Sequence, residues 1–226
     1  MENTPPIRVF LSEFQAGLFG YDLQICSPLA TVGDYLDAVE HFQAQTMADC
    51  YGCDGCCHER VPLTLADFYF SAYHQGGGQS VAAWLAEIAA VPVFFGKALD
   101  LQLPRLANGA CAFLNQQAKC CAAHNHRTFA CRSHCCLPKS ERAEALRAAI
   151  INTAEDELIR RLLAELAQNN AEDFLPNGRR LAGVSAADYA ANAFSSLPAE
   201  AWRQAQLKQL VGAELWQQLT AAESVG

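Results

Sequence analysis

The distribution of cysteine constrains this chain more than any other feature of its sequence. The 226 residues include eleven cysteines, about 5%, which is below the roughly 8–10% that marks small disulfide-bonded scaffolds. Four of the cysteines fall within eight residues, six lie between Cys111 and Cys136, and Cys26 stands alone. Clustering of this kind favours metal ligands over disulfide bridges.

The composition indicates a folded protein with an acidic surface. Hydrophobic residues make up 51% of the chain, which is enough for a buried core. The 24 acidic and 16 basic residues give a net charge of −8, which argues against a nucleic acid or an anionic membrane as partner. We expect a single metal-binding domain over residues 1–226, with a cysteine-rich core at about 50–136 and a helical C-terminal part at about 140–220. The expected partners are a metal ion or cluster and a second protein.

The sequence carries no visible signal for export or membrane insertion. Glu2 and Pro5-Pro6 stand where a secretory signal needs basic residues and an apolar run. The longest mainly apolar stretch, 81–95, contains Glu87 and Pro92 and is too short to cross a bilayer. We therefore expect a cytoplasmic protein, whose thiols stay reduced.

The hydrophobic pattern outside the cysteine clusters is mainly helical. Apolar residues recur at helical spacing after Gly33, Ser80 precedes a second amphipathic segment, and Thr64 with Asp67 forms an acidic variant of the capping box. The segments expected to be helical are 35–47, 64–74, 80–91, 141–168, a short one from 185, and 198–220. Residues 101–140 are expected to form loops with short extended pieces. The predicted fold is mostly α, a helical domain with cysteine-rich metal-binding loops and little or no β structure.

Residues 141–168 give the strongest helical signal. Five aliphatic residues fall on one side of this helix: Leu146, Ile150, Leu158, Leu162 and Leu166. Asp156 with Arg160, and Glu157 with Arg161, are spaced for ion pairs four residues apart. Core packing is the simpler interpretation of this helix, and a surface for a protein partner is the alternative.

The first cysteine cluster has the pattern C-x-x-C-x-x-C-C. Its members are Cys50, Cys53, Cys56 and Cys57. A C-x-x-C step lets two thiolates reach one tetrahedral ion, and Gly52 and Gly55 permit the tight turns that this requires. Neighbouring side chains on a trans peptide diverge, so the adjacent pair favours two metals, a multinuclear cluster, or one ligand beside a thiol that does not ligate. Reduced structural or redox thiols are the alternative.

The second cluster spaces Cys111, Cys121 and Cys131 ten residues apart. Together with the first cluster, these thiols can complete one site across about 80 residues. The segment from Leu101 to Ser140 also contains five basic residues and no Asp or Glu. Cations near thiols lower their pKa and offset the charge of a multi-thiolate site; a basic patch for a phosphate-bearing ligand is the alternative.

Several other side chains are open candidates. Imidazole is a common metal ligand, but with so many thiols present His58, His124, His126 and His134 are better interpreted as neighbours of the site. Three further thiols are either additional ligands or spare: Cys120, Cys135 and Cys136. The sequence indicates no catalytic residue.

The chain resembles the YkgJ-like family of CxxCxxCC proteins, described as zinc- or iron-chelating. The resemblance covers residues 50–136 and includes the four cysteines of the first cluster, the step Leu63-Thr64-Leu65-Ala66-Asp67, and Cys111-Ala112-Phe113-Leu114. It continues through Cys121 to Arg132, where the family has C-x-x-Tyr-x-x-Arg-Pro-x-x-Cys-Arg. His124 replaces the usual aromatic residue there and Thr128 replaces the proline.

This resemblance implies a centre of zinc or of iron and sulfur, with a 4Fe–4S cluster among the candidates. The metal ligands that we expect are Cys50, Cys53, Cys56, Cys57, Cys111, Cys121 and Cys131. One enzymatic branch of the broad family, similar to flagellin lysine methylases, implies an iron–sulfur centre used with S-adenosylmethionine. The sequence lacks both a C-x-x-x-C-x-x-C motif and a glycine-rich strand-to-helix turn, so it gives that branch limited support. A protein-interaction module with structural zinc is a third hypothesis.

Overall fold

The computed structural model describes residues 4–46, 52–74, 80–96, 98–169 and 184–221. The chain divides into two compact units, each assembled from separate stretches of sequence. Unit 1 comprises 1–48, 132–153 and 192–226, and unit 2 comprises 49–131 and 154–191. Within the described residues, no helix has the length and apolar character needed to cross a membrane.

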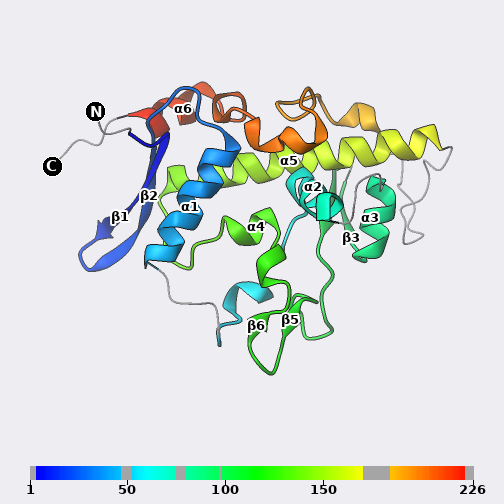
Figure 1. Ribbon diagram of the computed structural model, residues 1–226, viewed down its shortest axis with the longest axis horizontal. Helices are drawn as coiled ribbons and strands as arrows, with labels where there is room; N and C mark the ends of the chain where they lie inside the picture. The colour runs from blue at the N-terminus through cyan, green and yellow to red at the C-terminus, as the bar shows by residue number, and fades with distance from the viewer. Residues whose placement is uncertain (1–3, 47–51, 75–79, 97, 170–183, 222–226) are drawn as a thin grey trace. The chain divides into compact units, whose positions relative to one another are not determined.

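Unit 1 combines a β-hairpin with helices from both ends of the chain (Figure 1). Its elements are β1 (Ile7–Gln15), β2 (Leu18–Ile25), α1 (Val32–Thr46), η4 (Ala199–Gln204), η5 (Leu207–Gln209) and α6 (Ala213–Thr220), together with the first half of α5 (Glu141–Gln168). Its largest fully buried side chains include Tyr21, Tyr35, Leu36, Leu146, Ile150 and Phe194.

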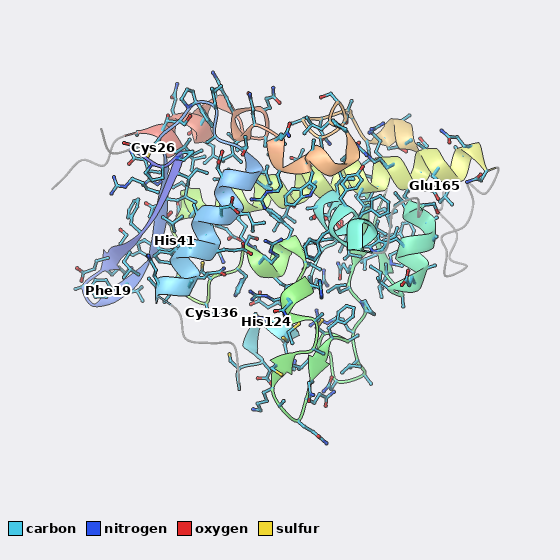
Figure 2. The ribbon with its side chains drawn as sticks, viewed as in Figure 1. Phe19, Cys26, His41, His124, Cys136 and Glu165 are labelled. Carbon is cyan, nitrogen blue, oxygen red and sulfur yellow. The ribbon has the colours of Figure 1, made fainter. Side chains whose placement is uncertain are left out.

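The hairpin explains why the prediction of little or no β structure fails at the N-terminus. Strand β1 pairs with β2 in antiparallel register, from Ile7 opposite Ile25 to Gln15 opposite Leu18, with Gly17 at φ +80° in the turn. In β2, Tyr21, Leu23 and Ile25 are buried while the residues between them are partly exposed, which is the period-two pattern of a half-buried strand. Figure 2 shows Phe19 and Cys26 towards opposite ends of this strand.

Unit 2 places short strands and helical turns around the cysteine segments. Its elements are η1 (Gly55–His58), α2 (Leu65–His74), α3 (Val81–Glu87), β3 (Val91–Phe95), β4 (Ala98–Gln102), β5 (Leu114–Asn115), β6 (Cys120–Cys121), η2 (His124–His126), α4 (Phe129–Arg132, whose last residue belongs to unit 1) and η3 (Ala186–Asp188), with the second half of α5. The rings of Phe68 and Trp84 meet edge-on at 5.5 Å and join α2 to α3.

The fold is mixed α/β rather than mostly α. The described residues contain three two-stranded antiparallel sheets, β1–β2, β3–β4 and β5–β6. Helix α3 ends at Glu87, earlier than the expected end at residue 91. The Val91-Pro92 pair instead begins strand β3. A β-branched residue and two phenylalanines follow in that strand, a composition that suits a strand paired with β4.

The continuous helix predicted over 198–220 is also wrong. This stretch forms η4, η5 and α6, because Ala205 and Gln206 are extended and contact the segment before α1. The Val32 N–H donates to the Ala205 carbonyl at 2.9 Å, and the Leu207 N–H donates to the Ala30 carbonyl at 3.0 Å. Backbone pairing within unit 1 therefore overrides the helical spacing of the leucines.

Helix α5 is confirmed with the predicted bounds, Glu141–Gln168. Its five predicted aliphatic residues are all buried, so core packing accounts for this face: Leu146, Ile150, Leu158, Leu162 and Leu166. The Glu157–Arg161 ion pair forms at 2.7 Å, but Arg160 pairs with Glu157 at 2.7 Å rather than with Asp156. One fully buried carboxylate thus receives two guanidinium groups, which offsets the cost of burying its charge.

Glu155, on the same helix, is a buried acid held by a strand of unit 2. Its Oε1 accepts a hydrogen bond from the Leu101 N–H of β4 at 2.9 Å. Burial raises the pKa of Glu155 to about 8; the Leu101 hydrogen bond lowers the pKa, and the charges of Asp100 and Asp156 raise it. The carboxyl group is therefore mostly protonated in the folded protein at neutral pH.

We expect the stability of the protein to fall as pH rises from about 4.5, the ordinary glutamate value, to about 8, because only the unfolded chain releases the Glu155 proton in this window. Glu155→Gln keeps an acceptor for Leu101 and removes the titration. The unfolding free energy of this variant, minus that of the wild type, should grow from pH 5 to pH 8.5. Urea unfolding at each pH measures it, and the linkage slope sets an upper limit of roughly 1.4 kcal/mol per pH unit. Glu214→Gln, at an exposed position on α6, is the control; a difference that does not change with pH would contradict the assignment.

Candidate metal centre

Six of the seven predicted ligands lie in the described part of unit 2. They are Cys53, Cys56, Cys57, Cys111, Cys121 and Cys131, and all six are free thiols. Cys50 lies outside the described residues. Cys111 is buried and Cys53 is exposed, while the other four are half-buried. The six predicted ligands that the structure describes are therefore free thiols within one unit.

Backbone hydrogen bonds join the two cysteine segments directly. The Cys111 N–H donates to the Cys57 carbonyl at 2.7 Å, and the Gly52 N–H donates to the Lys119 carbonyl at 3.1 Å. The same two stretches continue to pair beyond the cysteines, with Leu103 donating to Val61 at 3.0 Å. Residues far apart in the sequence are thus neighbours through their main chains.

The first cysteine segment turns tightly, as its glycines predict. Gly52 adopts φ +80°, a conformation that only glycine takes without strain. Cys56 and Cys57 lie in the 3₁₀ turn η1, in which the Asp54 carbonyl accepts the Cys57 N–H at 3.0 Å. His58 is exposed, and its Nε2 lies 3.8 Å from the Asp54 carboxylate. The main chain of Asp54 therefore forms part of this turn.

The second segment holds its cysteines on a short hairpin and a helical turn. Leu114 pairs with Cys121 and Asn115 with Cys120 in the β5–β6 ladder. Consecutive strand residues point to opposite faces, so Cys120 and Cys121 have different surroundings. Cys121 is the predicted ligand of this pair, and the role of Cys120 stays open.

Asp67 connects helix α2 to the turn that carries Cys131. Its Oδ2 accepts the Thr64 N–H at 2.8 Å and the Thr64 hydroxyl at 2.9 Å, so the predicted cap forms at the start of α2. Its Oδ1 accepts the Phe129 N–H at 2.6 Å, at the first residue of α4. The sequence indicates the cap but not this second role. At the same turn, the hydroxyl of Thr128 accepts the Cys131 N–H at 3.4 Å.

The thiols of unit 2 act on one another electrostatically. Burial raises the pKa of Cys57 to about 12, and the neighbouring thiols Cys56, Cys111 and Cys121 contribute to that rise. Burial likewise raises the pKa of Cys131 to about 11, with further contributions from Asp67, Cys56 and Cys111. Such groups stay protonated unless a cation compensates the thiolate charge.

Cys111 is the thiol common to these interactions. It raises the pKa of Cys57, of Cys131 and of Cys121, whose pKa is also raised mainly by burial. The adjacent thiols Cys56 and Cys57 also act on each other, since Cys56 raises the pKa of Cys57 through its charge and through a side-chain hydrogen bond. The two side chains therefore interact, contrary to the expectation that neighbouring side chains on a trans peptide diverge.

The remaining candidates are divided between the units. His124 and His126 lie in η2, and the ring of His126 is 5.7 Å from that of Phe70. In unit 1, Cys135 is buried and receives the Gln43 amide at 3.7 Å, and Cys26 and Cys136 are exposed. In the described ranges no set of three or more His, Cys, Asp or Glu side chains has the geometry to hold a metal ion.

The basic residues between Leu101 and Ser140 have different partners. They are Arg105, Lys119, Arg127, Arg132 and Lys139. Arg127 lowers the pKa of Cys121, although burial outweighs it. Arg132 instead pairs with Glu40 at 2.7 Å, and Lys139 pairs with Glu144 at 3.2 Å, both within unit 1. Arg127 therefore acts on Cys121 in the direction that the compensation hypothesis predicts, while Arg132 and Lys139 have carboxylate partners.

Comparison with known protein families supports a metal-chelating class for the cysteine-rich region. Residues 49–148 match the CxxCxxCC family, described as "Putative zinc- or iron-chelating domain". The resemblance predicted from the cysteine pattern is thus confirmed for residues 49–148, which match the model of this family. No curated protein and no solved structure matches the chain.

We expect Asp67→Asn to destabilise unit 2, because the amide group presents N–H donors where the carboxylate accepts from Thr64 and Phe129. A buried donor left without its acceptor costs roughly 1–3 kcal/mol, which urea unfolding measures. Thr64→Ser keeps both bonds from residue 64 and serves as the control. Equal unfolding free energies for Asp67→Asn and the wild type would show that Asp67 does not hold α4.

Proposed function

We propose that this chain is a metal-binding protein whose centre is held by cysteine thiolates of the two joined segments. The proposed ligands are Cys50, Cys53, Cys56, Cys57, Cys111, Cys121 and Cys131. The match of residues 49–148 to a zinc- or iron-chelating family supports the class of function. The proposal concerns the ligand set and the nature of the centre.

The observation that carries the proposal is the 2.7 Å hydrogen bond from Cys111 to Cys57. It joins one cysteine of each cluster through the main chain, and the thiol of Cys111 also acts on those of Cys57, Cys121 and Cys131. Burial of these thiols disfavours bare thiolates, so a bound cation would stabilise the ionised set. Since no described group has ligand geometry as it stands, binding would require the side chains to close around the metal.

The donor chemistry fits zinc and iron–sulfur centres alike. Thiolate sulfur is a soft ligand that both zinc and iron–sulfur clusters accept, and the described thiols are free. Hard cations such as Mg²⁺ and Ca²⁺ prefer oxygen ligands and suit this set poorly.

We further propose that the centre contains more than one metal. Seven thiols exceed the four ligands of a single tetrahedral ion. Metal analysis with a visible spectrum on anaerobically purified protein tests the proposal. A metal-to-protein ratio of one or below would contradict the multinuclear centre, and a brown protein would identify iron and sulfur.

Substitution of individual ligands tests the assignment directly. Cys131→Ser and Cys57→Ser should each lower the metal content and the solubility, because a structural metal contributes its binding energy to folding. Cys26→Ser is the matched control, since Cys26 is an exposed thiol of unit 1. Equal metal-to-protein ratios in all three variants would rule out the proposed ligands.

Removal of the metal should loosen the cysteine segments more than the rest of the chain. The cysteines themselves lie on short strands and turns and are mostly half-buried or exposed, so the bound metal should supply much of the stability of these turns. We expect treatment with a chelator to open cleavage sites for a protease between residues 50 and 136, mapped by mass spectrometry. Unchanged cleavage after complete metal loss would show that the centre does not organise this region.

A further inference from the structure

Arg105 contacts both cysteine segments through its guanidinium group. Its Nη1 donates to the Glu59 carbonyl and its Nη2 donates to the His58 carbonyl, directly after the first cluster. Its Nε donates to the Gly109 carbonyl at 2.7 Å, two residues before Cys111. The backbone of Arg105 also forms an antiparallel bridge with Cys111. One side chain therefore joins the end of the first cluster to the start of the second.

The acceptors of Arg105 distinguish it from the other cations of the segment. These three hydrogen bonds are to main-chain carbonyl oxygens, whereas Arg132 and Lys139 contact carboxylates. A planar guanidinium can donate in several directions at once, which a lysine ammonium cannot reproduce with the same geometry. Carbonyl acceptors also leave the positive charge of Arg105 without a neutralising anion in these contacts.

We infer that Arg105 is a positioning residue for the thiolate centre. It holds the main chain after Cys57 at a fixed distance from the main chain before Cys111, and so sets the approach of the two segments on which metal binding depends. This inference rests on the proposed function. It assigns to Arg105 a role that charge counting alone does not predict, because any cation in the segment could offset thiolate charge.

The test compares Co²⁺ binding by full-length variants, after removal of the metal under anaerobic reducing conditions. Thiolate-to-cobalt charge-transfer absorption reports ligation by cysteine. Arg105→Gln should weaken Co²⁺ binding about tenfold or more, the usual scale for residues that orient metal ligands. Arg105→Lys keeps the charge but loses the fork of donors, so its affinity should also fall. Arg60→Gln is the matched control, because Arg60 is exposed and follows Glu59, and its Cζ lies 6.0 Å from the centroid of the Phe95 ring. The Co²⁺ affinity of this variant should stay within about twofold of the wild type.

Chemical rescue separates positioning from a general loss of structure. Millimolar guanidinium should restore Co²⁺ affinity to Arg105→Gln and should not change the affinity of Asp67→Asn, because that substitution alters a different contact. Far-UV circular dichroism checks folding; if Arg105→Gln does not fold, Arg105→Lys carries the comparison. Wild-type affinity in Arg105→Lys, or equal losses in Arg105→Gln and Arg60→Gln, would overturn the inference. Absence of charge-transfer absorption in the wild type would instead overturn the proposed function.

Discussion

The pairing of main chains between Cys57 and Cys111 is the contact on which the rest of the candidate centre depends. It does not rely on side-chain identity, so the thiols carried by both segments can approach one another while their own conformations adjust to a ligand. Val61 and Leu63 extend the pairing to Leu103 and Leu101, which are buried. Buried apolar residues therefore pair beside the cysteines. Their burial, rather than any interaction of the thiols, offsets the entropy lost when the two distant segments come together.

Elements whose signal is local could be predicted from the sequence. Helix α5 repeats its apolar residues over 28 positions, and Ser80 caps α3 by accepting the Ala83 N–H at 3.1 Å. The N-terminal hairpin and the β3–β4 pair escaped prediction because β1 and β3 alternate only partly, and the alternation in β2 is confined to Tyr21–Ile25. The end of the chain breaks into short turns because it pairs with residues 30–32, which no local pattern indicates.

The cysteine spacing identified the kind of site, but not how its parts are held. A C-x-x-C-x-x-C-C pattern predicts thiol ligands because few other chemistries use it. It cannot say which neighbour of an adjacent pair faces which partner, since that depends on the turn η1 and on the position of Cys111. Nor does a count of basic residues distinguish Arg105, which donates to carbonyl groups, from Arg132, which pairs with an acid. These distinctions arise from tertiary geometry.

The boundary between the two units falls inside helix α5, after Thr153. The segment that matches the chelating family stops at residue 148, before Glu155, whose carboxyl group accepts the Leu101 N–H of strand β4. A fragment limited to the family match would leave the Leu101 N–H without this acceptor and would cut helix α5 short. The family match and unit 2 thus have different limits along the polypeptide, because unit 2 continues through residues 154–191.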